Sequence, residues 1–304
     1  MNKPPADAAR TLGTLFRWGR DRLREHGVDT PDLDARLLLL EASGIDHTVL
    51  IAAPDRAMAP EEAARFAELL KRRCAGEPVS RILGYREFHG HWLALSAATL
   101  DPRPETELVV DQCLRVVDLM GWRHSVGGRP LRLLDLGTGT GAIVISLLHA
   151  LPGAWGCAVD IAYEALATAR GNAARLGVGD RLALACGNWT DAFSGRFDVI
   201  LSNPPYIETS DIGELKPEVR CFDPVLALDG GQDGLAAYRR IIPSASQLLV
   251  PGGWLILEVG AGQAAAVIGL CRTAGFGPHA AVSETVTDLA GHARVVCMQL
   301  GWTT

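Results

Sequence analysis

The sequence predicts an α/β protein in which a doubly wound, mostly parallel sheet follows a small N-terminal helical bundle. First, apolar strand patterns alternate regularly with helical patterns from residue 131 to residue 300. Second, a glycine-rich turn, Gly137-Thr138-Gly139-Thr140-Gly141, directly follows the first of these strands. Third, residues 1–76 carry apolar residues at helical spacing. Together these patterns indicate two domains.

The N-terminal segment 1–76 is expected to be a helical bundle. Leu12, Phe16 and Leu23 recur at helical spacing, and Pro31 and Pro60 are typical of the first position of two further helices. No group of residues in this segment suggests chemistry. We therefore expect the bundle to dock a substrate.

Residues 77–104 are expected to form a linker with a β-hairpin, because aromatic and apolar residues alternate around Gly84 and Gly90. The segment Asp101-Pro102-Arg103-Pro104-Glu105-Thr106-Glu107 then leads into a helix over residues 109–117. This segment is either an ordinary helix start or part of an active-site wall. Residues 105–304 are expected to be the catalytic domain.

The catalytic domain has a regular order of predicted elements. Strands are expected at residues 131–136, 155–161, 182–186, 198–202, 253–259, 281–285 and 293–300. The helices between them are expected at residues 142–150, 164–176, 238–249 and 262–274. The last two strands lack helices between them, which predicts an antiparallel end of the sheet.

Composition excludes several classes of protein. The chain has 304 residues, 48% of them hydrophobic, and no apolar run reaches the about 20 residues that span a bilayer. Its N-terminus lacks a secretion signal, and its seven cysteines never form a Cys-x-x-Cys, so we expect a cytoplasmic protein with reduced thiols. The eight histidines show no metal-ligand spacing, and no metal is expected. A net charge of −6 disfavours unspecific binding to nucleic acid.

The glycine-rich turn predicts one end of a nucleotide site. Glycine lets the backbone turn tightly and approach a ligand closely, and a helix N-terminus follows. Asp160 ends the second strand, where a carboxylate can accept the hydroxyls of a ribose. Gly137, Gly139 and Ala142 also satisfy the dinucleotide pattern G-x-G-x-x-A, and a purely structural turn is a further alternative.

The other end of the predicted site is Asn203-Pro204-Pro205-Tyr206, directly after the fourth strand. Each proline fixes its own φ and restricts the preceding residue, so the Asn203 amide and the Pro204 carbonyl are held stiffly. Two fixed acceptors beside the Tyr206 ring suit a planar NH2 group, either a carboxamide or the exocyclic amine of a base. The alternative is a rigid polyproline turn in which Asn203 satisfies local backbone groups.

The third strand links the two ends. Trp189 follows that strand, where an aromatic ring could flank an adenine. A nucleoside pocket that faces an amide-recognition corner fits S-adenosylmethionine better than a dinucleotide, because no second phosphate-binding half is visible.

These motifs, in this order, resemble a class I S-adenosylmethionine-dependent methyltransferase. The wider match resembles the protein-(glutamine-N5) methyltransferases of bacterial peptide chain release factors, the PrmC/HemK family. It rests on Pro78-Val79, on Gly84 to Phe88, on 102–107, on Leu228-Asp229-Gly230-Gly231-Gln232-Asp233-Gly234-Leu235 and on Leu257-Glu258-Val259-Gly260-Ala261-Gly262-Gln263.

The resemblance implies a five-helix N-terminal domain, a hairpin linker and a Rossmann-like catalytic domain with a seven-stranded sheet. It also implies S-adenosylmethionine as cofactor and the glutamine of a release factor's Gly-Gly-Gln motif as substrate. Asp101 stands where the family usually has an apolar residue, which leaves the shape of that wall open. The chain's own Gly230-Gly231-Gln232 is interpreted as a coincidence and not as a self-substrate.

On this hypothesis Asn203 and Pro204 each accept one N–H of the glutamine amide, while Tyr206 packs on the amide plane and Pro205 completes the corner. The residues expected to hold the cofactor are Gly137, Thr138, Gly139, Thr140, Gly141, Asp160, Trp189 and Asn203.

Several alternatives stay open at this stage. The same corner could serve a glutamine methyltransferase of another translation protein, such as a ribosomal protein, or an adenine-N6 methyltransferase of nucleic acid. A binding module without turnover and a dehydrogenase are further alternatives. No direct nucleic-acid specificity and no membrane partner are expected.

Overall fold

The computed structural model describes residues 10–301. The chain divides into two compact units, and the division falls between Gly84 and Tyr85. This division lies inside the stretch 77–104, for which the sequence predicts a linker.

The described part of the smaller unit contains five helices, the number that the family resemblance implies. They are α1 (Leu12–Glu25), α2 (Pro31–Ser43), α3 (His47–Ala52), α4 (Pro60–Cys74) and α5 (Val79–Leu83). Leucines of α1, α2 and α4 form its core together with Phe66. A buried ion pair between Arg73 Nε and Asp34 Oδ2, 2.7 Å apart, joins α4 to α2.

Two of these helices differ from the expectation. The short α3 has too few residues to show a helical period. Helix α5 occupies residues that the sequence assigns to the hairpin, because Val79 and Ile82 also fit one helical turn. Gly84, with φ +80°, ends this turn in the left-handed region that favours glycine.

The larger unit begins with the predicted hairpin, formed by β1 (Tyr85–Phe88) and β2 (His91–Ala94). His89 and Gly90 make the two-residue turn, and both have positive φ values, 49° and 78°. Such a turn matches the right-handed twist of the strands.

The main sheet contains the strands β3 (Leu131–Leu136), β4 (Ala154–Asp160), β5 (Leu182–Cys186), β6 (Phe197–Ser202), β7 (Leu249–Glu258), β8 (Phe276–Gly277), β9 (Thr285–Thr287) and β10 (Ala293–Leu300). Seven of them follow the order β5-β4-β3-β6-β7-β10-β8, and β9 pairs only with β10. The first five are parallel, and β10 is antiparallel to its neighbours.

One predicted strand is wrong in its position. The sequence places a strand at residues 281–285, but the sheet uses β8 and β9 on either side of that stretch. Residues 279–282 instead form a small turn closed by the backbone bond from Val282 N to His279 O. Strands of two and three residues are too short to show the alternation of apolar and polar residues by which a strand is predicted.

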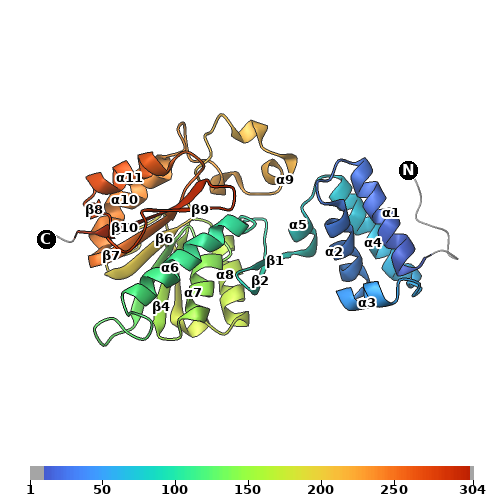
Figure 1. Ribbon diagram of the computed structural model, residues 1–304, viewed down its shortest axis with the longest axis horizontal. Helices are drawn as coiled ribbons and strands as arrows, with labels where there is room; N and C mark the ends of the chain where they lie inside the picture. Colours follow the sequence, from blue (N-terminus) through green and yellow to red (C-terminus); the bar gives the residue numbers. More distant parts are fainter. Residues whose placement is uncertain (1–9, 302–304) are drawn as a thin grey trace. The chain divides into compact units, whose positions relative to one another are not determined.

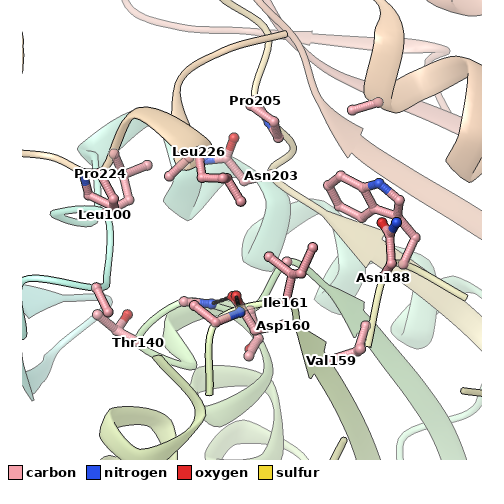
Figure 2. A pocket seen from close by; sticks show the side chains of 18 of the residues that line it. Leu100, Thr140, Val159, Asp160, Ile161, Asn188, Asn203, Pro205, Pro224 and Leu226 are labelled. Atoms are coloured by element: carbon pink, nitrogen blue, oxygen red, sulfur yellow. Dashed lines mark hydrogen bonds between the residues drawn. The ribbon is translucent and has the colours of Figure 1, made fainter. Parts of the chain in front are cut away.

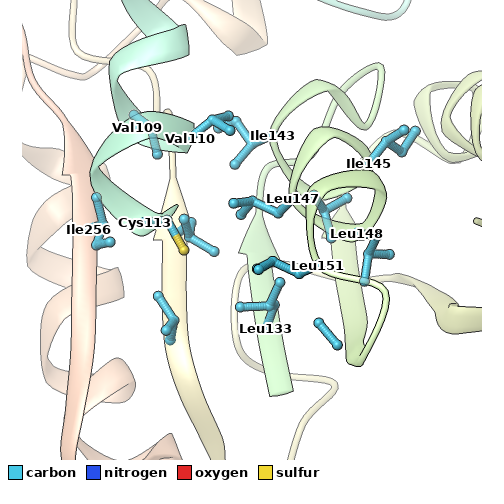
Figure 3. Packing of buried hydrophobic residues seen from close by; sticks show 14 of the residues in the cluster. Val109, Val110, Cys113, Leu133, Ile143, Ile145, Leu147, Leu148, Leu151 and Ile256 are labelled. Carbon is cyan, nitrogen blue, oxygen red and sulfur yellow. The ribbon is translucent and has the colours of Figure 1, made fainter. Parts of the chain in front are cut away.

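Helices cover both faces of this sheet (Figure 1). Helices α6 (Glu107–Leu119), α7 (Ala142–Ala150) and α8 (Tyr163–Arg175) contribute to the core on one face. Helices α10 (Ala236–Leu248) and α11 (Ala264–Thr273) contribute to the core on the other. Figure 3 shows Val109 and Cys113 of α6 and Leu147 of α7 packed above Leu133 of β3.

The strand register brings the predicted site residues to one edge. Leu136 of β3 pairs with Val159 of β4 on one side and with Ser202 of β6 on the other. Gly137 and Asn203 therefore leave the sheet side by side, as the carboxyl ends of parallel strands do. A hydrogen bond from Ser202 Oγ to the Leu136 carbonyl, 2.6 Å long, joins the two strand ends.

Between β6 and α10 the chain forms a long connection with one short α-helix, α9 (Pro217–Arg220), and two 3-10 turns, Ile212–Glu214 and Val225–Ala227. In the part of the chain that the structure describes, no helix has the length and apolar character needed to cross a membrane.

Candidate active site

A cavity of about 550 Å³ opens at the carboxyl edge of the sheet, within the larger unit. Figure 2 shows Asn203 and Pro205 on one side of this space and Thr140 and Asp160 on the opposite side. The predicted site residues that line it are Gly137, Thr138, Gly139, Thr140, Asp160, Trp189, Asn203 and Pro205. Gly141, Pro204 and Tyr206 do not line it.

The glycine-rich turn requires glycine for two different reasons. Gly137, Gly139 and Gly141 all have positive φ values, between 55° and 83°. A Cβ at Gly137 would lie 3.3 Å from Cζ3 of Trp189, and a Cβ at Gly141 would lie 2.6 Å from Cδ1 of Ile145. At Gly141 the positive φ favours glycine, and a Cβ would also crowd the Ile145 side chain.

Asp160 holds the turn from the end of β4. Its Oδ2 accepts a hydrogen bond from Gly139 N at 2.8 Å, and its Oδ1 accepts one from Ala162 N at 2.9 Å. Each carboxylate oxygen has a second lone pair, so the side chain can still accept hydroxyl groups of a ligand from the cavity.

Trp189 has a φ of +57°, which is rare for a large side chain. Such a conformation costs about 1–3 kcal/mol and persists where its surroundings hold it. Here the backbone conformation places the Trp189 indole against Gly137. The strained residue is thus one that lines the cavity.

The Asn203 side chain is held from behind. Its Nδ2 donates to Thr106 Oγ1 at 3.0 Å, and Thr106 also lines the cavity. The next residue, Pro204, is buried, and no donor within residues 10–301 reaches its carbonyl oxygen. Asn203 Oδ1 and Pro204 O are thus two acceptors that the described protein groups leave available.

Tyr206 lies outside the residues that line the cavity. Its ring packs against the core beneath α10, and its hydroxyl lies 3.3 Å from Oε1 of Glu258. Burial and the nearby Glu258 raise the pKa of this phenol well above its usual value. Gln263 Nε2 donates to the Tyr206 carbonyl at 2.9 Å. Tyr206 thus holds the corner from behind, and the packing of its ring on a substrate amide stays a prediction.

The segment around Arg103 forms part of the wall. Arg103 donates to Asp223 Oδ2 at 2.6 Å, and Asp101 N donates to Asp223 Oδ1 at 3.3 Å. The neighbours Pro102 and Pro224 both line the cavity. This ion pair therefore joins two walls that lie 120 residues apart in the sequence.

Comparison with known proteins agrees with this geometry. The chain is 47% identical over 275 residues to the release factor glutamine methyltransferase of Bradyrhizobium diazoefficiens, which covers 90% of each protein. It is 45% identical to the enzyme of that name from Agrobacterium fabrum, over 91% of this chain and 93% of that protein. The chain belongs to the release factor glutamine methyltransferase family. Family models described as PrmC N-terminal domain and Methyltransferase small domain match residues 14–84 and 127–215.

The family fold is the class I methyltransferase fold that the sequence predicts, with its seven strands in order and β9 as a short addition. A solved structure with this fold is the hMettl16 catalytic domain in complex with MAT2A 3'UTR hairpin 6, with a TM-score of 0.53 and 16% identity. It covers 80% of this chain and 83% of that one, and at this identity the likeness concerns the fold alone.

The chain's own Gly-Gly-Gln has a structural explanation. A Cβ at Gly230 would lie 2.8 Å from the Tyr206 Cα, and a Cβ at Gly234 would lie 2.4 Å from the Tyr206 carbonyl oxygen. Gln232 is exposed and does not line the cavity. The glycines of this loop thus let it pack against the Asn-Pro-Pro-Tyr corner of this family member.

Three site residues have no role assigned from the sequence. Thr106 and Glu258 lie in segments that carry the family resemblance. That resemblance is the one feature of the sequence that points to them. Leu226 lines the cavity from the connection before α10 and is 66% exposed. A lone apolar residue in a connecting segment gives no signal in one sequence.

Asp135, at the end of β3, is a buried acid directly behind the turn. Its Oδ2 accepts from Thr138 Oγ1 at 2.6 Å. Burial raises the pKa of this carboxyl to about 7, while Thr138 and the Val144 backbone lower it and Asp160 raises it further. Its Oδ1 nevertheless has no partner of full hydrogen-bond geometry within the described residues.

We predict that Asp135→Asn stabilises the protein at pH 8. The folded-state pKa lies above the usual value of 3.8, so the native state keeps a proton that the unfolded chain loses between about pH 4 and pH 7. Stability therefore falls as the pH rises through that window. An asparagine at this position has no charge to bury, so it removes the cost of ionising the carboxyl in the folded state. Each unit by which the pKa is raised corresponds to about 1.4 kcal/mol of that cost.

Urea unfolding of both proteins at pH 5 and pH 8 measures the effect. The free-energy advantage of Asp135→Asn should be larger at pH 8. An equal difference at both values would contradict a raised pKa at Asp135.

Proposed function

We propose that this chain transfers a methyl group from S-adenosylmethionine to N5 of the glutamine in the Gly-Gly-Gln motif of peptide chain release factors. The observation that carries the proposal is the acceptor Asn203 Oδ1 at the cavity, with the Asn203 amide oriented by Thr106. The carbonyl of the next residue, Pro204, accepts no hydrogen bond from residues 10–301 and is proposed as the second acceptor. A primary carboxamide has two N–H donors, and two fixed acceptors match them.

The residues of the cavity fit the cofactor. The volume of the cavity suits a ligand of the size of S-adenosylmethionine, and the glycine-rich turn lets a ligand approach the backbone closely. Asp160 would hold the ribose hydroxyls, and Trp189 would flank the adenine, with 137–141 and Asn203 along the rest of the molecule. When bound, S-adenosylmethionine supplies an electrophilic methyl group on its sulfonium.

The work of the chain itself is to orient a poor nucleophile. An amide nitrogen shares its lone pair with the carbonyl, so it attacks only when that lone pair is turned out of conjugation. With one N–H held by Asn203 Oδ1 and the other by Pro204 O, the lone pair faces the cofactor side of the cavity. Positive charge that develops on this nitrogen, as the methyl carbon leaves sulfur and bonds to nitrogen, strengthens both hydrogen bonds and lowers the barrier. The nitrogen would then release one proton to solvent, which leaves a neutral methylated amide.

Pro205 and Tyr206 keep this corner rigid. Pro205 lines the cavity beside Asn203. Tyr206 anchors the following backbone through Glu258 and Gln263. We assign the substrate contacts to Asn203, Pro204, Pro205 and Tyr206, with Tyr206 also holding the corner from behind.

The release factor needs a larger contact than one glutamine side chain. We assign this contact to the helical unit, proposed as the substrate-docking domain over residues 1–76, ahead of the linker at 77–104 and the catalytic domain at 105–304. We also propose that the enzyme meets its substrate in the cytoplasm, where thiols stay reduced.

Transfer of labelled methyl groups tests the proposal. The acceptors are a purified release factor, its Gly-Gly-Gln variant with Gln→Ala, a ribosomal protein fraction and DNA. We expect label on the intact factor and none on its Gln→Ala variant. Label on ribosomal protein or on DNA alone would replace the proposed substrate by that acceptor. The variant Gln232→Ala of this chain should label the factor normally, because Gln232 is exposed and outside the cavity.

Asn203→Ala should lower turnover by about 10²–10³, the usual effect of removing one preorganised polar group. Cofactor affinity should largely survive, because Gly137 to Gly141 and Asp160 remain. Initial rates on the release factor and calorimetry with S-adenosylmethionine measure the two effects. Near-normal turnover of this variant would contradict the role of Asn203.

Asp160→Ala should instead weaken the cofactor by about 10- to 100-fold, since a charged acceptor of the ribose is lost. Its loss also frees Gly139 N, so thermal unfolding serves as the control for a damaged turn. Unchanged affinity in calorimetry would mean that the ribose lies elsewhere.

A further inference from the structure

A line of three side chains leads from the core to the reacting corner. Glu258 ends β7, Thr106 stands before α6, and Asn203 follows β6. Asn203 Nδ2 donates to Thr106 Oγ1 at 3.0 Å. Thr106 also interacts with the Glu258 carboxyl and lowers its pKa, although Oε2 meets no partner in full hydrogen-bond geometry within residues 10–301.

Two members of this line are buried. Thr106 is 4% exposed and Glu258 is 1% exposed. Glu258 does not line the cavity, so water has little access to its carboxyl, and a buried polar group needs a partner within the protein. Oε1 of Glu258 also faces the Tyr206 hydroxyl.

The order of donors and acceptors along this line follows from valence. A threonine hydroxyl has one proton to donate. An ionised carboxylate can only accept, so an interaction of Thr106 with Glu258 uses the Thr106 hydroxyl proton. The remaining lone pairs of Thr106 then face Asn203, which can offer only its Nδ2 protons. Its Oδ1 must point away from Thr106.

The two flip states of Asn203 are not equivalent for a carboxamide substrate. With Nδ2 on Thr106, the corner presents an acceptor to the N–H of the substrate. With the Asn203 amide reversed, its Nδ2 would face the N–H of the substrate. Two donors cannot form a hydrogen bond, so the contact between Asn203 and the substrate is lost. The flip state of Asn203 is thus a condition of binding the nucleophile in the reactive orientation.

We propose that Thr106 is a positioning residue that fixes the flip state of the Asn203 amide, and that Glu258 is the buried acceptor that fixes the Thr106 hydroxyl. The inference deepens the proposed function, since it rests on Asn203 as the residue that accepts from the substrate amide. Thr106 and Glu258 would act through Asn203, without contact to the reacting atoms.

The charge state of Glu258 bears on this order. Burial raises the pKa of its carboxyl to about 7, against the lowering effects of Thr106, Tyr206 and Arg294, and Glu105 raises it further. A protonated carboxyl can donate to Thr106, which frees the Thr106 proton for Asn203 Oδ1. Turnover should therefore decline as the pH falls through about 7.

The test compares Thr106→Val with Thr106→Ser. Valine keeps the shape of threonine but has no hydroxyl, whereas serine keeps the hydroxyl and loses only the methyl group. We expect Thr106→Val to lower kcat on the release factor by roughly 10- to 100-fold, as the loss of one buried orienting hydrogen bond does. Thr106→Ser should recover most of the rate.

Three readouts separate positioning from general damage. KM for the factor, calorimetric affinity for S-adenosylmethionine and thermal unfolding should change little in Thr106→Val. If kcat of Thr106→Val stays near normal, or if Thr106→Ser is as slow as Thr106→Val, the positioning role is overturned.

A readout without turnover keeps this inference separate from the proposed function. In ¹⁵N-labelled protein, the Asn203 side-chain NH2 signals, assigned by their loss in Asn203→Ala, should shift in Thr106→Val and stay close to wild type in Thr106→Ser. Unchanged signals in both would overturn the hydrogen bond. Absence of methyl transfer by the wild type, with the shift observed, would overturn only the assigned reaction.

Glu258→Gln tests the second half of the proposal. A glutamine side chain is neutral at every pH, so the decline of kcat below about pH 7 should disappear. A decline that persists in Glu258→Gln would assign it to another group, such as Asp135, and would overturn the role of Glu258.

Discussion

The parallel register of β3 with β4 and β6 is the constraint on which the rest of the site depends. Leu136 pairs with Val159 and with Ser202, so the residues that follow these three positions emerge side by side. Gly137, Asp160 and Asn203 are those residues. A slip of one strand by a single residue would turn its side chains to the other face, and the cavity edge would lose its matched ends. The apolar cores on both faces of the sheet hold this register.

Around this edge the protein buries several polar groups and satisfies most of them. Asp160 holds the glycine turn, Ser202 joins two strand ends, and Gln263 holds the backbone after the proline pair. Asp135 and Glu258 are the costly members, because burial shifts both pKa values to about 7. Acids with such values occur at functional sites more often than elsewhere. In this protein each lies directly behind one end of the cavity.

The rigidity of the corner comes from covalent and packing restraints together. The two prolines fix φ directly after Asn203, and close contacts of Gly230 and Gly234 with the Tyr206 backbone restrain the chain just beyond them. The ion pair between Arg103 and Asp223 ties the two neighbouring walls. A corner held in this way presents its acceptors without reorganisation when a substrate arrives, which is the physical meaning of preorganisation.

The sequence by itself determined the parallel sheet and the family, because strands of five to ten residues with helices between them carry a strong period, and because the glycine turn and Asn203 to Tyr206 are contiguous. It did not locate β8, β9 or α5, whose two to five residues are too few to show a period. Only the tertiary structure decided that Tyr206 contacts Glu258 and Gln263, and that Thr106, which lies outside the Asn-Pro-Pro-Tyr motif, holds the Asn203 amide from another element. These contacts join residues 52 to 97 positions apart. Such distances are set by the packing of whole elements, and no local pattern in the chain encodes them.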